Sequence, residues 1–554
     1  MSNNLRFRKS QASISNIERS AFKSLSHSYK TSFNVGELIP ILVQEVLPGD
    51  EFKIDTSIVG RLQTPLAPAM DDLYLEYFYF FVPTRLVWDD WKYFMGEQKS
   101  AWLDDNVYKI PSIPLNARGS TPINRYSFAD YLGIPPGAYP EVDIPISVLP
   151  HRAYVKIWNE WFRDQNLQDP LLEYSGNANV SNEAARMFSN TSTTGILKVN
   201  KRHDYFTSAL PGPQKGPNVH IPFGDVLLPV VTGDDLTNAN KEPLRWIERN
   251  SNAAADNGYL GNKLDSTVIL PSTLPGDEVE VIPGNLWADG TYGSFGAPTI
   301  NALRLAFQIQ KIYEKDARSG SRYVEIIRSH FGVVSPDARQ QRPEYLGGGI
   351  ERIGMQQQVA TTAGSDGESE ANMLGTVGAY SYTQHSKYNF NKAFTEHGFI
   401  IGLATLRYTH TYTQGIPKYL TRQDRFDFYD PTLAHLGEQP IMKSELYIED
   451  HLSYSDLIWG YNEAWADYRY NPNRATADMR PGPDMLGHLW HYGDYYTQEP
   501  FLSANWIKED KSNVERTLAL SSDVVKNFYC DIYFNIYAKR PMPLYSIPGL
   551  IDHF

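Results

Sequence analysis

The amino-acid sequence predicts an all-β fold, a β-sandwich with long insertions and a few accessory helices. Two strand patterns lie towards opposite ends of the chain, at residues 51–58 and 528–537, and helical periodicity is confined to short passages between them. Aromatic residues make up 13% of the 554 residues and include 36 tyrosines, which suit half-buried sheet faces better than long exposed helices. Strands at both ends with long connections between them are typical of a sandwich whose connections carry the elaborations.

The two terminal strand patterns alternate between apolar and polar residues, as half-buried strands do. The second has one apolar face and one face of tyrosines and polar residues. The apolar faces comprise Phe52, Ile54, Thr56 and Ile58 in the first pattern and Phe528, Cys530, Ile532, Phe534 and Ile536 in the second. We therefore expect both segments to cover the core of one sandwich.

Two further segments are apolar on both faces, so we expect them to be buried strands. The first, DDLYLEYFYFFVP, runs from residue 71 and stops at Pro83, because proline cannot donate a hydrogen bond to a neighbouring strand. The second, GFIIGLATLRYTHTY, covers residues 398–412, where Gly402 predicts a bulge or a close approach of another chain segment.

Helical periodicity predicts two accessory helices, within residues 151–167 and 299–320. The second is expected to end at Gly320. Both apolar stripes are expected to contact the core rather than a ligand. The stripe residues are Val155, Trp158, Trp161 and Phe162 in the first helix and Leu303, Phe307 and Ile309 in the second.

Cysteine content and hydropathy limit the class of protein. A single cysteine, Cys530, excludes an intramolecular disulfide framework and a cysteine-rich zinc site, and fits maturation in a reducing cytosol. The start, MSNNLRFRKSQ, lacks the apolar run of a signal peptide, and no stretch approaches 18 consecutive apolar residues. We expect neither secretion by the usual signal nor membrane insertion.

Charge is distributed unevenly along the chain. The formal net charge is −13, yet residues 1–30 carry six basic residues and one acid, a net of +5. This segment is rich in Ser and Asn, so it is expected to be a flexible arm until a partner orders it; a merely solvated terminus is the alternative. The basic residues expected to contact nucleic acid are Arg6, Arg8, Lys9, Arg19 and Lys23.

Residues 225–297 form a long connection that is dense in Gly, Asn, Asp and Pro. It holds 11 acidic and 4 basic residues, a net of −7. A connection of this length is expected to be either disordered or a surface excursion with a small fold of its own, and such insertions usually carry function.

The segment YLGGGIERIG, residues 345–354, raises the question of a phosphate-binding loop. Glycines let backbone N–H groups approach an anion, but the third glycine of a dinucleotide fingerprint is missing, and no Gly-Lys-Ser or Gly-Lys-Thr occurs. We interpret the glycines as a bend or tight loop that needs positive φ.

Catalytic and metal-binding patterns are weak. His488 and His491 have Asp484 and Asp494 nearby, but without an HExxH motif or a third ligand at a recognisable spacing we expect a structural aromatic cluster. The adjacent carboxylates at 71–72 and 234–235 do not define the separation that a glycosidase needs. No G-x-S-x-G motif occurs, and Cys530 lies on an apolar strand face. We therefore predict no catalytic residues, no metal and no cofactor.

Several long segments carry a family resemblance. They are SHSYKTSFNVGELIPILVQEVLPGDEFKI (26–54), NEWFRDQNL (159–167), DYFTSALPGPQKGP (204–217), IIRSHFGVVSPDARQQRPEYLGGG (326–349) and RPMPLYSIPGLIDH (540–553). The chain resembles the major capsid proteins of gokushoviruses, small single-stranded DNA bacteriophages among the microviruses. The resemblance runs from the arm to the last residues and is least secure in residues 225–297. It places YLGGG in a capsid segment that leads into an extended Gln- and Gly-rich connection.

The resemblance implies an eight-stranded jelly roll that forms a single-layer T=1 icosahedral shell, with one chain per asymmetric unit. The expected divisions are a basic arm (1–30), a first part of the jelly roll with helical elaborations (31–224), an insertion projecting at the threefold axes (225–297), and the remaining jelly roll with a C-terminal extension (298–554). The insertion is expected to contact the bacterial surface through Asp234, Asp235, Trp246, Tyr259 and Trp287.

The implied partners are copies of the chain itself, the circular single-stranded DNA genome, a small basic DNA-packaging protein, a DNA pilot protein and a bacterial surface receptor. The protein is expected in the virion, after assembly in the cytoplasm of the bacterial host. A β-sandwich carbohydrate-binding protein or a receptor-binding virion protein is the alternative that the aromatic, acidic composition leaves open.

Overall fold

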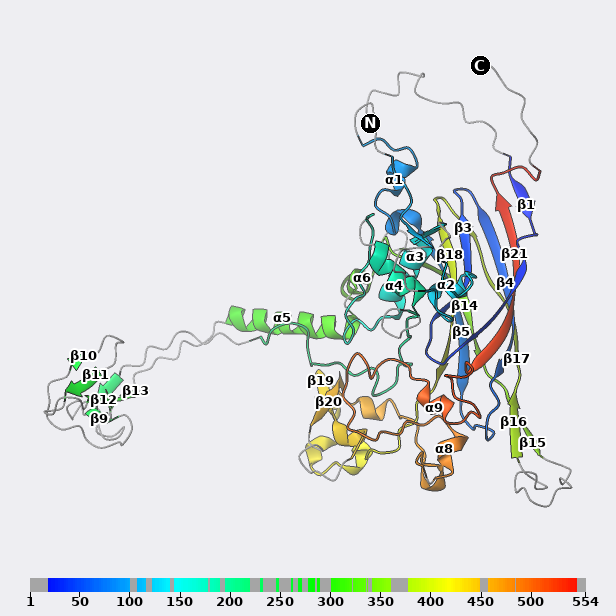
Figure 1. The fold of residues 1–554 in the computed structure, drawn as a ribbon. Helices are drawn as coiled ribbons and strands as arrows, with labels where there is room; N and C mark the ends of the chain where they lie inside the picture. Colours follow the sequence, from blue (N-terminus) through cyan, green and yellow to red (C-terminus); the bar gives the residue numbers. More distant parts are fainter. Residues whose placement is uncertain are drawn as a thin grey trace. The chain divides into compact units, whose positions relative to one another are not determined.

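The computed structural model describes residues 18–99, 107–115, 122–139, 144–177, 180–189, 195–219, 230–232, 246–248, 261–262, 268–271, 278–283, 286–288, 300–320, 322–334, 336, 341–359, 377–448, 457–483 and 485–545. The chain divides into two compact units (Figure 1). One unit comprises Met1–Gln214 with Glu314–Phe554, and the other comprises Lys215–Tyr313.

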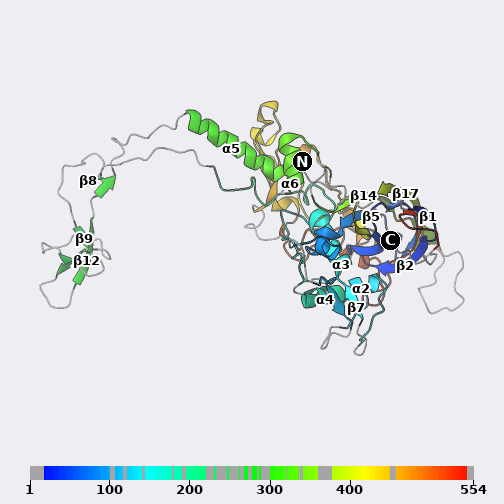
Figure 2. The same ribbon diagram turned by 90° about the horizontal axis from the view of Figure 1, so that it is seen from above.

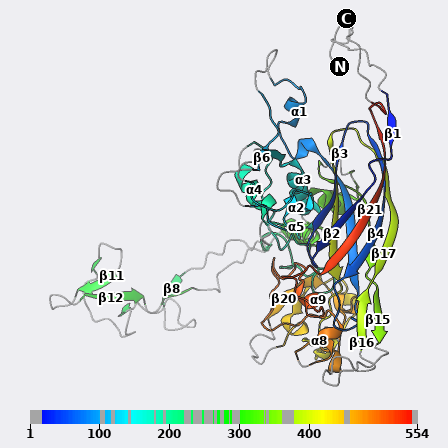
Figure 3. The ribbon, with the colours of Figure 1, turned by 45° about the vertical axis from the view of Figure 1, so that its right-hand side comes forward.

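The larger unit contains an antiparallel β-sandwich, with its two sheets face to face (Figures 1 and 3). The first sheet has the order β2-β21-β4-β17, and β1 pairs with the far end of β21. The second has the order β14-β5-β18-β3. The strands are β1 (Ser20–Phe22), β2 (His27–Phe33), β3 (Ile39–Val46), β4 (Glu51–Leu62), β5 (Leu73–Pro83), β14 (Glu344–Arg352), β17 (Thr383–Ala393), β18 (Gly398–Tyr408) and β21 (Phe528–Arg540).

Along the chain, the sandwich strands alternate between the two sheets from β2 to β5 and again from β14 through β17 and β18 to β21. The alternation breaks only between these two runs, because β5 and β14 are neighbours in the second sheet. This order is consistent with a viral jelly roll, and the predicted all-β fold is confirmed. In the described residues β1 and β2 are separate strands along the same edge of β21, so the expected count of eight strands stays a prediction.

The two terminal strand patterns form one ladder, because β21 pairs with β4 along almost its whole length. Ile532 lies opposite Ile58, and both are buried in the core of the sandwich. Every residue predicted for the apolar faces of these two strands is buried. The alternation of the sequence therefore specifies which face of each strand covers the core.

The strand β5 is covered on both faces, as its sequence predicts. Helix α3 (Leu149–Ile157) continues into the π-helical turn η4 (Trp158–Phe162), and both lie beside the second sheet. The ring of Phe162 lies 5.3 Å from that of Phe78, and the ring of Trp161 lies 5.4 Å from that of Phe80. Figure 2 shows α2, α3 and α4 beside the sandwich, seen along its strands.

The predicted bend at residues 345–354 is wrong, because most of this segment is the strand β14, with a bulge between Tyr345 and Gly347. The glycines allow close packing against β5. A β-carbon at Gly348 would lie 3.2 Å from the Cα of Phe78, and one at Gly349 would lie 2.6 Å from the ring of Tyr77. Steric fit to a neighbouring strand, and not anion binding, accounts for these glycines.

Glycines also shape two other predicted features. The ladder between β18 and β3 shifts register at Gly402, as predicted, and a β-carbon there would lie 2.9 Å from the ring of Tyr79. Helix α5 (Ile300–Ser319) ends just before Gly320, which has φ of +95°. The predicted end of this helix is confirmed, but the predicted core contact of its apolar stripe is wrong at Phe307, which is 58% exposed.

A second, smaller core lies in the same unit, where residues after β18 pack with residues 205–209. It contains Tyr205, Phe206, Ala209, Tyr412, Ile441, Leu446, Trp459 and Ala466. Two strands, β19 (Glu438–Met442) and β20 (Ile458–Glu463), pair beside it. The remaining elements of the larger unit are α1 (Trp91–Phe94), β6 (Ser112–Pro114), α2 (Phe128–Tyr131), β7 (Pro145–Ser147), α4 (Val180–Phe188), α6 (Tyr323–Phe331), β15 (Met355–Val359), β16 (Val377–Ser381), α8 (Gly487–Trp490) and α9 (Ser512–Glu515), with several single 3₁₀ turns.

The described strands of the smaller unit form two sheets, of the order β10-β11-β12-β9 and β13-β8. They are β8 (Val230–Thr232), β9 (Trp246–Glu248), β10 (Gly261–Asn262), β11 (Val268–Pro271), β12 (Glu278–Pro283) and β13 (Leu286–Ala288). The predicted insertion, 225–297, falls within this unit, but the four predicted chain divisions are not tested and stay predictions.

Candidate functional site

The solvent-facing side of the first sheet carries a row of tyrosines on its long strand β21. Tyr529, Tyr533 and Tyr537 follow one another at every fourth position, and their exposed fractions are 39%, 49% and 38%. They point away from the core because residues of opposite parity on β21 are buried. We call this surface the tyrosine face.

Cations of the neighbouring strand β4 stand beside these rings. Arg61 lies opposite Tyr529 and Lys53 lies opposite Tyr537 in the ladder. The Lys53 ammonium also lies 5.4 Å from the ring centre of Tyr388 on β17. The same side of the two strands also carries the carboxylates Asp55 and Asp531. Exposed rings with cations beside them can stack on bases and contact phosphates, and tyrosines of this kind also suit protein–protein contacts.

Two of the five predicted arm residues lie in the described part of the chain. Arg19 and Lys23 flank β1 and are exposed. Because Ser20 lies opposite Arg540, β1 lengthens the edge of the sheet that bears the tyrosine face. Arg6, Arg8 and Lys9 lie outside the described residues.

The predicted host-contact residues are only partly described. Asp234, Asp235 and Tyr259 lie outside the described residues. Trp246 lies in β9, opposite Pro283, whereas Trp287 lies in β13, opposite Val231. The structure thus places the two tryptophans in different small sheets.

His491 of the GHLWHYGDYY segment forms structural contacts. The backbone N–H of Gly493 donates to Nδ1 of His491, 2.8 Å away, and Nε2 of His491 contacts the carbonyl of Met479. Asp494 bonds to His410 instead of either predicted histidine, and Asp484 lies outside the described residues. Within the described ranges, no three His, Cys, Asp or Glu side chains are grouped to hold a metal ion.

Cys530 and the paired carboxylates also have structural surroundings. Burial raises the pKa of the Cys530 thiol to about 12, which keeps it protonated and unreactive. Asp71 accepts a hydrogen bond from the backbone of Tyr492, and Asp72 pairs with Arg352. Of the helices that the structure describes, none has the length and apolar character to cross a bilayer.

A buried ionic cluster at the end of β18 was not predicted from the sequence. The His410 ring lies between Asp494, at 3.0 Å from Nδ1, and Glu509, at 3.2 Å from Nε2, and all three side chains are almost fully buried. Burial alone would lower the pKa of His410, but the charges of the two carboxylates outweigh it and raise the pKa to about 10. Lys201, 3.8 Å from Asp494, adds a second positive charge.

A buried carboxylate on β5 is held in a similar way. Glu76 is fully buried and accepts hydrogen bonds from Nε of Arg202 at 3.0 Å and from Nε of Arg407 at 2.8 Å. These contacts join β5 and β18 to the segment that leads to the second core. No local sequence pattern points to either cluster, because the partners are far apart in the chain.

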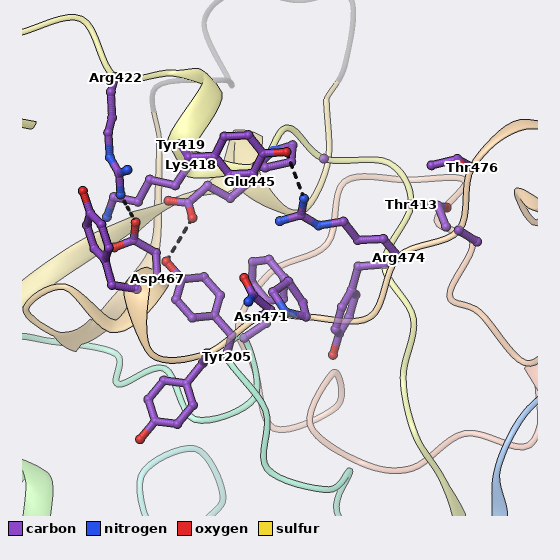
Figure 4. Close-up of a pocket in the computed structure, with 18 of the residues that line it drawn as sticks. Tyr205, Thr413, Lys418, Tyr419, Arg422, Glu445, Asp467, Asn471, Arg474 and Thr476 are labelled. Atoms are coloured by element: carbon purple, nitrogen blue, oxygen red, sulfur yellow. Dashed lines mark hydrogen bonds and ion pairs between the residues drawn. The ribbon is translucent and has the colours of Figure 1, made fainter. Parts of the chain in front are cut away.

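A pocket of about 400 Å³ opens beside the second core (Figure 4). We call it the tyrosine pocket. Tyr205 donates to Glu445 at 3.0 Å, Arg422 pairs with Asp467, and Arg474 lies 3.5 Å from the hydroxyl of Tyr419. The lining residues include Tyr205, Phe206, Tyr412, Thr413, Lys418, Tyr419, Arg422, Glu445, Asp467, Tyr468, Tyr470, Asn471, Arg474, Thr476 and Arg480.

An antiparallel sandwich in viral jelly-roll order, with exposed tyrosines on its first sheet, is typical of structural proteins that pack into virus shells. Comparison with known proteins gives the family. The chain belongs to the phage capsid protein family described as "Capsid protein (F protein)", whose model matches residues 10–550. It is a structural component of the virion and not an enzyme.

Three capsid relatives match almost the whole chain. Capsid protein VP1 of Spiroplasma virus 4 is 39% identical over 535 residues, which cover 95% of this chain and 94% of the relative. Capsid protein VP1 of Bdellovibrio phage phiMH2K is 36% identical, with 96% and 95% covered. Capsid protein VP1 of Chlamydia phage 1 is 34% identical, with 98% and 97% covered. The predicted resemblance to gokushovirus major capsid proteins is confirmed.

Proposed function

We propose that this capsid protein builds a small T=1 icosahedral shell around a circular single-stranded DNA genome, with one chain per asymmetric unit. The observation that carries the proposal is the tyrosine face, where exposed rings stand beside Lys53 and Arg61. A sequence-tolerant DNA contact needs rings for stacking and cations for phosphates.

The tyrosine face and the basic arm belong to the same side of the protein in this proposal, the side that faces the genome. The support is local, since β1, which lies within the predicted arm, pairs with β21 at the edge of the sheet. An acidic body repels DNA, so cations must be supplied where the two meet. Arg6, Arg8 and Lys9 then contact phosphates or the small basic packaging protein, and the DNA pilot protein joins the same particle.

The insertion at 225–297 is proposed to contact the bacterial surface. Its net charge of −7 suits selective contact with a complementary receptor, through residues such as Asp234, Asp235, Trp246, Tyr259 and Trp287. Assembly of the particle is placed in the host cytoplasm, in keeping with the single cysteine.

Nuclease protection tests the genome-enclosing function. Particles purified from infected cells are treated with nuclease, and the remaining nucleic acid is extracted and digested with a single-strand-specific enzyme. Protected circular single-stranded DNA that co-sediments with this chain is the expected result. Particles in which the chain is dominant but no DNA is protected would contradict the proposal.

A further inference from the structure

We infer that the tyrosine pocket binds one nucleotide unit, a base with its phosphate. The inference rests on the proposed genome-enclosing function and adds a defined site to it. The pocket lies beside the second core and its volume, about 400 Å³, is within the range of small-ligand sites.

The rings that line the pocket provide surfaces for stacking. Tyr419 and Tyr470 are 57% and 52% exposed, and the guanidinium of Arg474 lies 5.5 Å from the ring centre of Tyr419, so Tyr470 offers an open ring and Tyr419 a ring with a cation beside it. Tyr205 and Tyr412 are buried and form part of the second core. A base inserted into the pocket therefore meets open rings as well as a fixed aromatic wall.

The charges that line the pocket select an anion. Both carboxylates are already engaged, since Glu445 accepts from Tyr205 and Asp467 pairs with Arg422. Within the described residues, Arg474 and Arg480 have no carboxylate at ion-pair distance, which leaves two uncompensated cations, whereas the charge of Lys418 acts on the Glu445 carboxylate. Engaged carboxylates offer little to a neutral sugar, whereas free cations beside rings match a phosphate attached to a base.

Polar groups at the pocket can contact the edge of a base. Asn471 and Thr476 are exposed lining residues, and the Asn471 amide offers both a donor and an acceptor. In Figure 4, Asn471 lies between Tyr205 and Arg474. The arrangement fits any base, because stacking and phosphate contacts do not depend on its identity.

Fluorescence anisotropy with the full chain tests the site. The probes are a labelled single-stranded oligo(dT) about eight nucleotides long, within the usual site size, and an abasic strand of equal length. The variant Tyr470→Leu/Arg474→Gln removes one ring and one cation. Its matched control, Tyr323→Leu/Arg328→Gln, removes an exposed ring and an exposed cation from α6 and keeps the basic arm.

The pocket variant is expected to weaken oligo(dT) binding at least about fivefold and to lower the log–log salt slope by about 0.7 for one lost phosphate contact. The control variant is expected to bind like the original chain, and Tyr470→Phe is expected to retain stacking. Free dTMP competes for the site in either case. If oligo(dT) binds no tighter than dTMP, the pocket is a site for free nucleotides. If oligo(dT) binds tighter, the pocket is a site for the DNA strand.

Equal losses in the pocket and control variants, or equal affinity for abasic and base-bearing strands, would overturn the inference. Displacement of the probe by a neutral oligosaccharide but not by dTMP would overturn it as well. These failures leave the proposed function intact if purified particles still protect DNA, whereas DNA-free particles refute the proposed function independently of the pocket.

Discussion

Gly349 on β14 lies directly opposite Tyr77 on β5 and packs against the hydroxyl end of its ring. A β-carbon at position 349 would lie 2.6 Å from two ring carbons, closer than real side chains approach. The glycine run that resembles an anion loop is thus a steric requirement of the second sheet. The hydroxyl of Tyr77 meanwhile bonds to His385 on β17, 2.9 Å away, and so joins the two sheets.

Gly349→Ala is expected to lower the free energy of unfolding by about 1–3 kcal/mol, the usual cost of overpacking a well-packed core. Urea denaturation of the unassembled chain measures the change. Gly378→Ala on β16 is the control, because the nearest atom to a β-carbon there is 3.8 Å away. Equal stability of the two variants would show that β14 and β5 do not pack as described.

His410→Gln is expected to destabilise the protein by about 3–5 kcal/mol near pH 6.5, because it removes the cation between the buried carboxylates of Asp494 and Glu509 and leaves only Lys201 beside Asp494. The pKa of His410 is raised from 6.5 to about 10, so its stabilisation is complete below pH 6.5 and declines as the pH rises to about 10. The difference in free energy of unfolding between the original chain and His410→Gln should therefore become smaller as the pH rises from 6.5 to about 10.

Unfolding measured across that pH range, with the exposed His435→Gln as control, tests the cluster. Burial raises the pKa of Asp494, but the charges of His410 and Lys201 outweigh burial and hold this pKa well below its usual range. Protonation of Asp494 therefore lowers stability only in acid, outside the pH range of this measurement. A pH-independent difference between the original chain and the variant would mean that His410 is neutral in the fold.

Replacing Arg6, Arg8 and Lys9 by Ser is expected to weaken DNA retention in particles. At about 0.7 per single-strand phosphate contact, loss of three contacts lowers the log–log salt slope by about two. DNA release from purified particles, followed over a series of salt concentrations, measures this slope. Unchanged salt sensitivity, or removal of the arm by protease from intact full particles, would make the arm an assembly element instead.

Exchange of residues 225–297 with the equivalent segment of a related phage is expected to transfer adsorption to the donor's host. The reason is that an exposed acidic insertion can be recognised by a complementary receptor without change to the sandwich. Adsorption rates on both hosts measure the transfer, and particle yield controls for assembly. Chimeric particles that adsorb only to the original host would restrict the insertion to assembly or stability.

Local periodicity was enough to predict much of the sandwich. The alternation in β4 and β21 predicts their buried faces, and the apolar segment ending at Pro83 predicts a strand covered on both sides, all confirmed by burial. These features are predictable because burial on one face of a strand imposes a two-residue period. The pairing of β4 with β21 required the structure, since no local pattern gives long-range register.

Features that depend on distant partners were not predictable from the sequence. The partners of His410 come from residues 494 and 509, and Gly349 needs the ring of Tyr77 to explain it. The tyrosine pocket is likewise built from residues around 205, 419 and 470, which no spacing rule connects. Charge composition does identify the arm and the insertion, but it does not give their contacts.

A single-particle reconstruction of purified virions tests the central claim, that this chain forms the shell, most directly. The expected result is a continuous icosahedral shell with one copy of the jelly roll per asymmetric unit and with Tyr529, Tyr533 and Tyr537 directed towards the interior. A shell built from another protein, with this chain present only as a minor projecting component, would contradict it.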